Sequence, residues 1–101
     1  MKLLKSFVGL TVEKVASVHD YIQIHFSDGS ILTVNNGYST VGGEVHSFEG
    51  AQVLSATDDD RKFIINFDNE RTLCVGLTEE FYANYPEAMH FVRGDDICVW
   101  N

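Results

Sequence analysis

The stretch Tyr21–Val34, YIQIHFSDGSILTV, returns without a gap 41 residues later as Lys62–Val75, KFIINFDNERTLCV. In each copy apolar side chains alternate with mixed ones, the period of two that indicates a half-buried β-strand. A polar turn follows, and in the first copy Asp28-Gly29 supplies the positive φ angles of a tight hairpin. A second alternating strand completes each copy. The identical residues all fall where we expect the core to be: Ile24 and Ile65, Phe26 and Phe67, Leu32 and Leu73, Val34 and Val75.

A glycine pattern precedes each of these two hairpins and occurs once more near the C-terminus. Residues 7–12, FVGLTV, match residues 48–53, FEGAQV, and residues 92–97, VRGDDI, repeat the shape a third time. We interpret each glycine as a turn or bulge that starts a strand. Residues 9–34 and 50–75 are then two repeated three-stranded meanders, and His90–Val92 pairs with Ile97–Trp100 in a closing hairpin. The sequence predicts one mainly β domain, residues 1–101, with six to seven antiparallel strands in a sandwich or open barrel.

Three segments lie outside this pattern. Residues 1–8 are compatible with a leading strand or a helical turn. Residues 35–47, NNGYSTVGGEVHS, form either a plain linker or a binding loop, and Val45–Phe48 can add a short strand. In residues 76–90, Thr78 followed by two glutamates resembles a helix start, and Pro86 either ends that helix or begins a second turn with Glu87-Ala88-Met89. We therefore predict one short helix near residues 78–85.

The chain has the composition of a cytoplasmic protein. No run approaches the ~20 apolar residues of a membrane span. The N-terminal residues MKLLKSFVGL lack the apolar region of a signal peptide, which needs about 7–15 residues. Cys74 and Cys98 are too few for a disulfide scaffold, and we expect both to be free thiols.

The formal net charge is −8, and it is unevenly distributed. Residues 1–14 contain three lysines and one glutamate, so the rest of the chain is strongly acidic. Such a surface repels nucleic acids and membrane phosphates and attracts basic partners, although many proteins are acidic only for solubility.

The densest acidic run is Asp58-Asp59-Asp60, and Glu79-Glu80 and Asp95-Asp96 are further doublets. Three carboxylates at a turn can simply be solvated, or they can pair with lysines and arginines of a partner protein. On the second interpretation, the predicted partner-binding residues are Asp58, Asp59, Asp60, Glu79, Glu80, Tyr82 and Tyr85.

The sequence contains no catalytic motif. Its four histidines lack metal-ligand spacing, and neither cysteine lies in a glycine-rich elbow or at a predicted helix N-terminus. The motifs of serine hydrolases, P-loop proteins and dinucleotide-binding proteins are also missing. We therefore expect a protein that is not an enzyme and that has no catalytic residues, no cofactor and no metal.

Gly9-Leu10-Thr11-Val12, Asp28-Gly29 and Pro86-Glu87-Ala88-Met89, followed by a C-terminal Val-Trp strand, resemble a group of small cytosolic bacterial β-proteins. Many of these are immunity proteins of polymorphic or contact-dependent growth-inhibition toxins. The resemblance implies a non-catalytic inhibitor that covers the active site of a cognate toxin, often a basic nuclease. It transfers no functional residue to this chain.

Two other hypotheses remain from the sequence. One is a small-ligand or carbohydrate-binding β module, with Trp100, Tyr38 and His25 lining a cleft. The other is a non-catalytic regulatory subunit that assembles through an exposed edge strand. In the free state we expect a monomer or a weak dimer, without nucleic acid or membrane as a partner.

Overall fold

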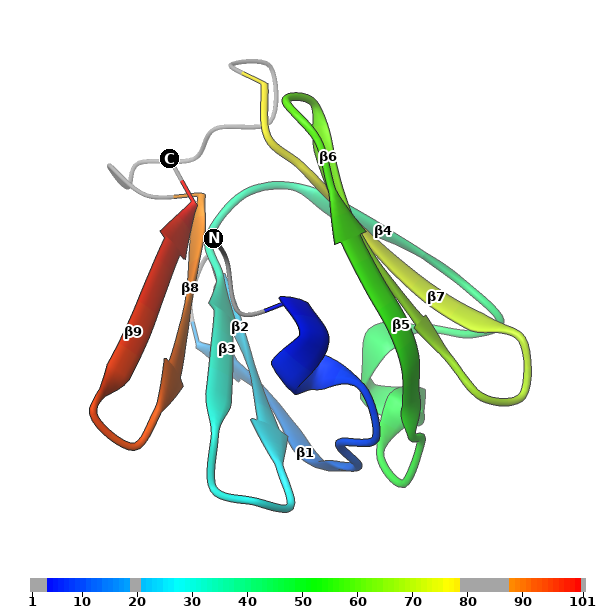
Figure 1. Ribbon diagram of the computed structural model, residues 1–101. Coiled ribbons are helices and arrows are strands. Elements are labelled where there is room, and N and C mark those ends of the chain that lie inside the picture. The colour runs from blue at the N-terminus through cyan, green and yellow to red at the C-terminus, as the bar shows by residue number, and fades with distance from the viewer. Residues whose placement is uncertain (1–3, 19–20, 79–87, 101) are drawn as a thin grey trace.

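The computed structural model describes residues 4–18, 21–78 and 88–100. These residues form two short 3₁₀ helices and nine β-strands: η1 (Leu4–Phe7), β1 (Val12–Val18), β2 (Tyr21–Phe26), β3 (Ile31–Val34), β4 (Tyr38–Val41), η2 (Val45–Phe48), β5 (Val53–Asp58), β6 (Lys62–Phe67), β7 (Arg71–Gly76), β8 (Met89–Arg93) and β9 (Asp96–Trp100). The strands make two antiparallel sheets, one of five strands in the order β1-β2-β3-β8-β9 and one of four in the order β4-β7-β6-β5. Figure 1 shows the two sheets facing each other with η1 between them. The prediction of a mainly β fold of sandwich type is confirmed.

The prediction of six or seven strands is wrong, and the sheets are not simply two copies of one meander. β1-β2-β3 and β5-β6-β7 are consecutive antiparallel strands, but each sheet has different additions. The five-stranded sheet gains the β8–β9 hairpin, in which Val92 lies opposite Ile97. The four-stranded sheet gains β4, in which Tyr38 lies opposite Val75. The linker-or-loop segment therefore supplies a strand that its polar residues did not reveal.

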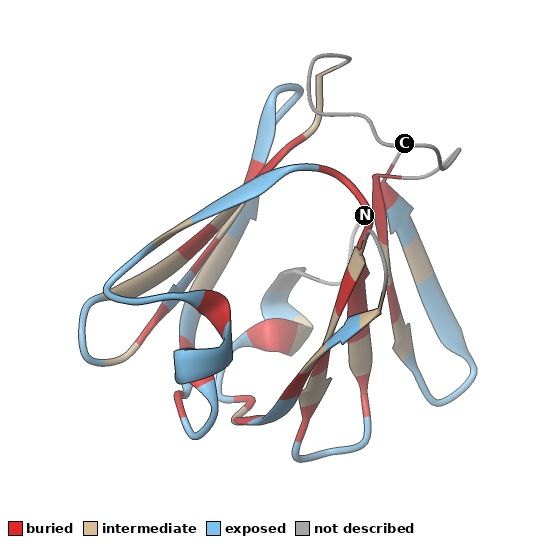
Figure 2. Ribbon diagram, turned by 180° about the vertical axis from the view of Figure 1, so that it is seen from behind, coloured by how far each residue is buried: buried red, intermediate tan, exposed pale blue. Residues whose placement is uncertain are grey.

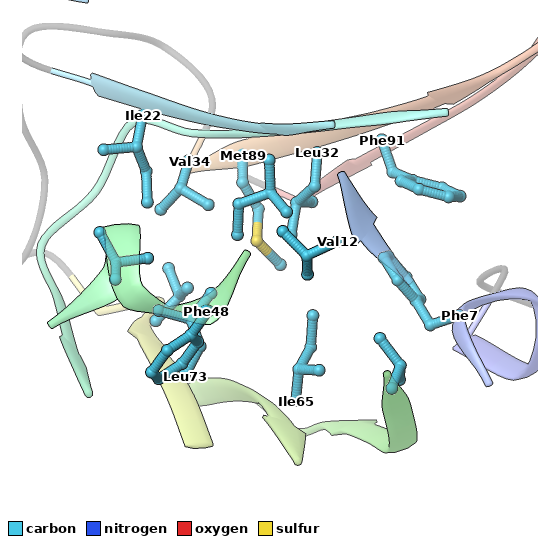
Figure 3. Packing of buried hydrophobic residues seen from close by; sticks show 14 of the residues in the cluster. Phe7, Val12, Ile22, Leu32, Val34, Phe48, Ile65, Leu73, Met89 and Phe91 are labelled. Carbon is cyan, nitrogen blue, oxygen red and sulfur yellow. The ribbon is translucent and has the colours of Figure 1, made fainter. Parts of the chain in front are cut away.

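The core lies between the inner faces of the two sheets. All eight residues of the four identical pairs are buried, which confirms the prediction that they face the core. Figure 3 shows Leu32 of one sheet and Ile65 of the other pointing toward each other across the core. Phe7 of η1 is fully buried, and its ring lies 4.2 Å from the ring of Phe91, centroid to centroid. Burial of this apolar surface is the main force that holds the sheets together.

Backbone hydrogen bonds join the two sheets where the meanders begin. The Gly9 N–H donates to the Val53 oxygen at 2.9 Å, and Gly50, 41 residues further on, donates to the Val12 oxygen at 2.7 Å. Thr11 forms an isolated antiparallel bridge with Gln52, its own equivalent in the second meander. These reciprocal contacts relate the two starts by an approximate two-fold axis. In the same crossed manner η1 contacts β5 and η2 contacts β1.

The structure also settles the segments that the sequence left open. Residues 4–7 form a 3₁₀ helix, and Val45–Phe48 forms a second one rather than the short strand considered for it. The predicted helix near residues 78–85 falls outside the described residues, apart from Thr78. Within the described ranges, no helix combines the length and the apolar character needed to cross a membrane.

Candidate functional site

The acidic run Asp58–Asp60 lies where β5 turns into β6, as the sequence predicted for a strand connection: Asp58 is the last residue of β5, and Asp59 and Asp60 lie in the connection itself. The Asp59 carboxylate accepts hydrogen bonds from the backbone N–H groups of Arg61 at 2.7 Å and of Lys62 at 3.0 Å. These N–H groups, that of Arg61 first, lower the pKa of Asp59 below its ordinary value. Asp59 and Asp60 are exposed, so the turn presents carboxylates to solvent in a conformation that the backbone itself fixes.

Asp58 has a different environment from its two neighbours. The indole N–H of Trp100 donates to the Asp58 carboxylate at 2.9 Å. Trp100 is 3% exposed, and its ring lies 5.2 Å from that of Phe63. The hydrogen bond therefore links the last strand of one sheet to the turn of the other, which gives Asp58 a structural contact in addition to any role in binding.

The structure does not test the other predicted partner-binding residues. Glu79, Glu80, Tyr82 and Tyr85 all lie outside the described residues. Thr78, which precedes them, is described and lies close to the Asp58–Asp60 turn, in the depression discussed below.

The acidic doublet Asp95-Asp96 lies apart from the triplet. Trp100, which contacts Asp58, is at one end of β9, and Asp96 is at the other end. Four residues of extended strand separate them by about 13 Å. The two acidic groups therefore mark opposite ends of β9 and do not form one compact patch.

A shallow depression of about 240 Å³ lies beside the Asp58–Asp60 turn, against β4, β7 and the start of β6. Its lining residues are Gly37, Tyr38, Ser39, Arg61, Lys62, Cys74, Gly76 and Thr78. Burial, with the charge of Glu44, raises the pKa of Tyr38, so at neutral pH its phenol is protonated and can donate a hydrogen bond. Two cationic side chains and a phenol can bind a small anion. Sequence reasoning missed this site, although Arg61-Lys62 is the only adjacent pair of basic residues in the chain.

Ser17, His46 and Glu44 form a second polar array that the sequence did not predict. The Ser17 hydroxyl lies 3.0 Å from His46 Nε2, and His46 Nδ1 lies 3.3 Å from a Glu44 carboxylate oxygen. A serine hydrolase uses this order of groups, but it also needs oxyanion donors and a substrate cleft. All three residues are exposed, and none lines the depression. We assign the array to holding the segment of η2 against β1.

The residues of the ligand-binding hypothesis do not converge. Trp100 faces the core, because the inward positions of β9 alternate with the exposed Ile97 and Val99. Tyr38 lies in the depression on the four-stranded sheet, and His25 is on β2 of the other sheet. Cys74 and Cys98 are free, half-buried thiols. Among the described residues, no three acidic, histidine or cysteine side chains are grouped as metal ligands.

Comparison of the chain with protein-family models, with curated proteins and with solved structures found no match.

Proposed function

We propose that this protein is a non-catalytic inhibitor that binds and neutralises a basic protein toxin, as bacterial immunity proteins do. The observation that carries the proposal is the Asp58–Asp60 turn. Asp59 is fixed by two backbone N–H groups of its own turn, and Asp60 is exposed beside it. A binding surface of this kind loses little conformational entropy when a partner docks.

A nuclease is the toxin class that fits the charge of this chain best. Its active site must attract phosphates and therefore carries positive potential. Carboxylates held at a turn tip can occupy that cleft in place of phosphates, and a net charge of −8 accelerates association with a cationic protein. Such an inhibitor needs only a rigid scaffold and exposed acidic groups. Because a nuclease toxin would attack nucleic acid in the cytoplasm, we place the inhibitor there.

The direct test is inhibition of the toxin encoded beside this protein's gene. The purified neighbouring product is assayed for nuclease activity while this protein is titrated against it. The proposal predicts loss of activity at one equivalent, and weaker inhibition by a double variant carrying Asp59→Asn and Asp60→Asn. Undiminished nuclease activity with this protein in excess would contradict it. A double variant carrying Glu13→Gln and Glu70→Gln, which removes two exposed carboxylates elsewhere, is the matched control.

A second function is favoured by one observation, the cationic depression. Arg61, Lys62 and the protonated Tyr38 line it together, so a small carboxylate or phosphate ligand is the chemical class that fits. Titration with inorganic phosphate and with acetate, followed by amide chemical shifts, tests this function. Saturable shifts at Tyr38 and Lys62 that disappear in Arg61→Gln would favour a ligand-binding module. Absence of a saturable shift in the wild type would refute this ligand-binding function.

A further inference from the structure

The four sheet edges are not equally protected. β1 and β5 are edge strands with irregular register, between Val12 and Lys14 and between Val53 and Ser55. A carboxylate oxygen of Glu49 accepts the backbone N–H of Val15 at 2.9 Å, so a side chain occupies part of the β1 edge. η1 contacts β5 in the same region of the other sheet. Bulges and covering elements of this kind prevent another chain from pairing with an edge.

Within the described ranges, β9 has neither a register shift nor a covering element. It pairs with β8 through five consecutive residue pairs without a shift in register. Among the described residues no strand lies on its other side, where alternate residues direct their N–H and C=O groups away from β8. Ile97 is 66% exposed and Val99 38% exposed. β9 contains no proline and no lysine, the residues that usually block an edge. Figure 2 shows β9 as a largely exposed outer strand, at the right of the five-stranded sheet in that view.

The apolar middle of β9 continues across the outer face of its sheet. Ile97 lies opposite Val92, and Val92 lies opposite Ile31 on β3. Val92 and Ile31 are half-buried, whereas Ile97, the last residue of this row at the sheet edge, is exposed to solvent. A strand added beside β9 would place one of its own alternate side chains next to Ile97 and thereby extend the row.

Both ends of this edge are acidic. Asp95 and Asp96 are exposed at the start of β9. At its other end Trp100 contacts Asp58, the first residue of the acidic turn that continues through Asp59 and Asp60. An incoming segment therefore meets hydrophobic contacts in the middle and carboxylates at each end. Arg93, which lies opposite Asp96, is ion-paired with Asp28, and Arg61 and Lys62 follow the acidic run, so the carboxylates outnumber the cations at both ends.

We infer that β9 is a docking edge, which accepts an extended segment of a basic partner protein as an added strand. The segment has alternating apolar side chains in its centre and lysine or arginine at both ends. Backbone hydrogen bonds to β9 supply affinity, and the flanking charges fix the position of the segment. This inference rests on the proposed function and names how the cationic partner is held.

Charge distinguishes this occupant from a second copy of the chain. An antiparallel pair of β9 strands would place Asp95 and Asp96 of each copy near the Asp58 end of the other, and each copy carries −8. β4 is also an edge without a register shift, but Tyr38 at its start lies in the depression with Arg61 and Lys62, whose charges oppose a basic segment. Of the two unshifted edges, β9 is therefore the one suited to a cationic strand.

Backbone amide exchange measured by NMR tests the docking edge directly. The probe is a synthetic peptide with two lysines at each end and alternating valine and threonine between them. At a peptide concentration about ten times its Kd, we expect exchange of β9 amides that face outward to slow roughly tenfold. A peptide with glutamates in place of the lysines should give no protection. Absence of protection on β9 at millimolar lysine peptide, or equal protection by both peptides, would overturn the inference.

A matched pair of variants separates the docking edge from general effects of charge. Ile97→Lys places a cation on β9, and Leu54→Lys places one on β5 at a residue of similar exposure, 57% against 66%. Peptide protection should be lost in Ile97→Lys and retained in Leu54→Lys. Protection of β9 amides that rises with protein concentration alone would identify a second copy as the occupant and would also overturn the inference.

The same variants keep this inference distinct from the proposed function. If the Ile97→Lys variant is correctly folded and still inhibits the toxin as well as the wild type does, the proposed inhibitor function is supported and the docking edge is refuted. If the wild type does not inhibit the toxin but the lysine peptide still protects β9, the inhibitor function is refuted and β9 remains supported as a binding site for basic segments.

Discussion

Separating Asp58 from Trp100 should cost measurable stability, because this hydrogen bond joins the two sheets at one end of the sandwich. The indole N–H donates to a carboxylate oxygen at 2.9 Å, and Trp100 is 3% exposed while Asp58 is half-buried. A hydrogen bond to an ionised acceptor contributes ~1.5–3 kcal/mol. Because Asp58 is only half-buried, we expect a coupling energy near the lower value, about 1.5 kcal/mol.

A double-mutant cycle isolates this coupling. Asp58→Ala, Trp100→Phe and the double variant are unfolded in urea at neutral pH and followed by circular dichroism. Trp100→Phe also loses packing against Phe63, but the cycle subtracts that loss. Asp60→Ala, the exposed neighbour, is the control and should change the free energy of unfolding by less than about 0.5 kcal/mol. A coupling energy below about 0.3 kcal/mol would refute the view that Asp58 holds the sheets together, because independent sites add to within that range.

Three further predictions concern the scaffold. Phe7→Ala should lower the free energy of unfolding by ~3–5 kcal/mol, since the ring is fully buried, whereas the 55% exposed Val8→Ala should change it by less than about 0.5 kcal/mol. Gly42→Ala should destabilise more than Gly29→Ala: both have φ near +90°, but a Cβ on Gly42 would lie 2.7 Å from a backbone oxygen of the turn between β6 and β7, and one on Gly29 would meet nothing within 4 Å. A smaller loss for Gly42→Ala in thermal unfolding would contradict the close approach of Gly42 to that turn. The lowered pKa of Asp59 means that its stabilising contribution is present above the ordinary value of 3.8 and is lost as pH falls through the lower folded value. The difference in urea stability between wild type and Asp59→Asn should therefore narrow as the pH falls below 3.8, and a difference that stays the same down that range would contradict a stabilising role of the ionised Asp59 side chain.

The alternating residues of the two hairpins were enough to predict their strands and their inward faces. Ile24, Phe26 and their equivalents are buried because a period of two places them on one side of a strand, which is a local property of the sequence. The same reasoning did not find β4. Residues Tyr38–Val41 are exposed or half-buried and are defined by pairing with β7, more than 30 residues away. Such long-range pairing leaves no local pattern to read.

The candidate site was predictable in part. The acidic turn follows from three adjacent aspartates between two predicted strands. The sequence does not predict that Asp58 has a structural contact while Asp59 and Asp60 are exposed, because the contact between Asp58 and Trp100 joins residues 42 positions apart. The separation of Asp95-Asp96 from the triplet likewise depends on the direction of β9 in the sheet. The cationic depression needs β4 to lie beside β7, so it could not be expected once residues 35–47 were interpreted as a linker or loop.

The rate of association with the proposed toxin partner, the product of the neighbouring gene, measured by stopped flow at increasing salt, tests the central claim most directly. If exposed carboxylates at fixed positions steer this protein to a cationic partner, the rate constant should fall steeply with ionic strength, and the fall should be shallower for the variant with Asp59→Asn and Asp60→Asn. A rate constant that is insensitive to salt, or identical salt dependence in wild type and variant, would contradict the account.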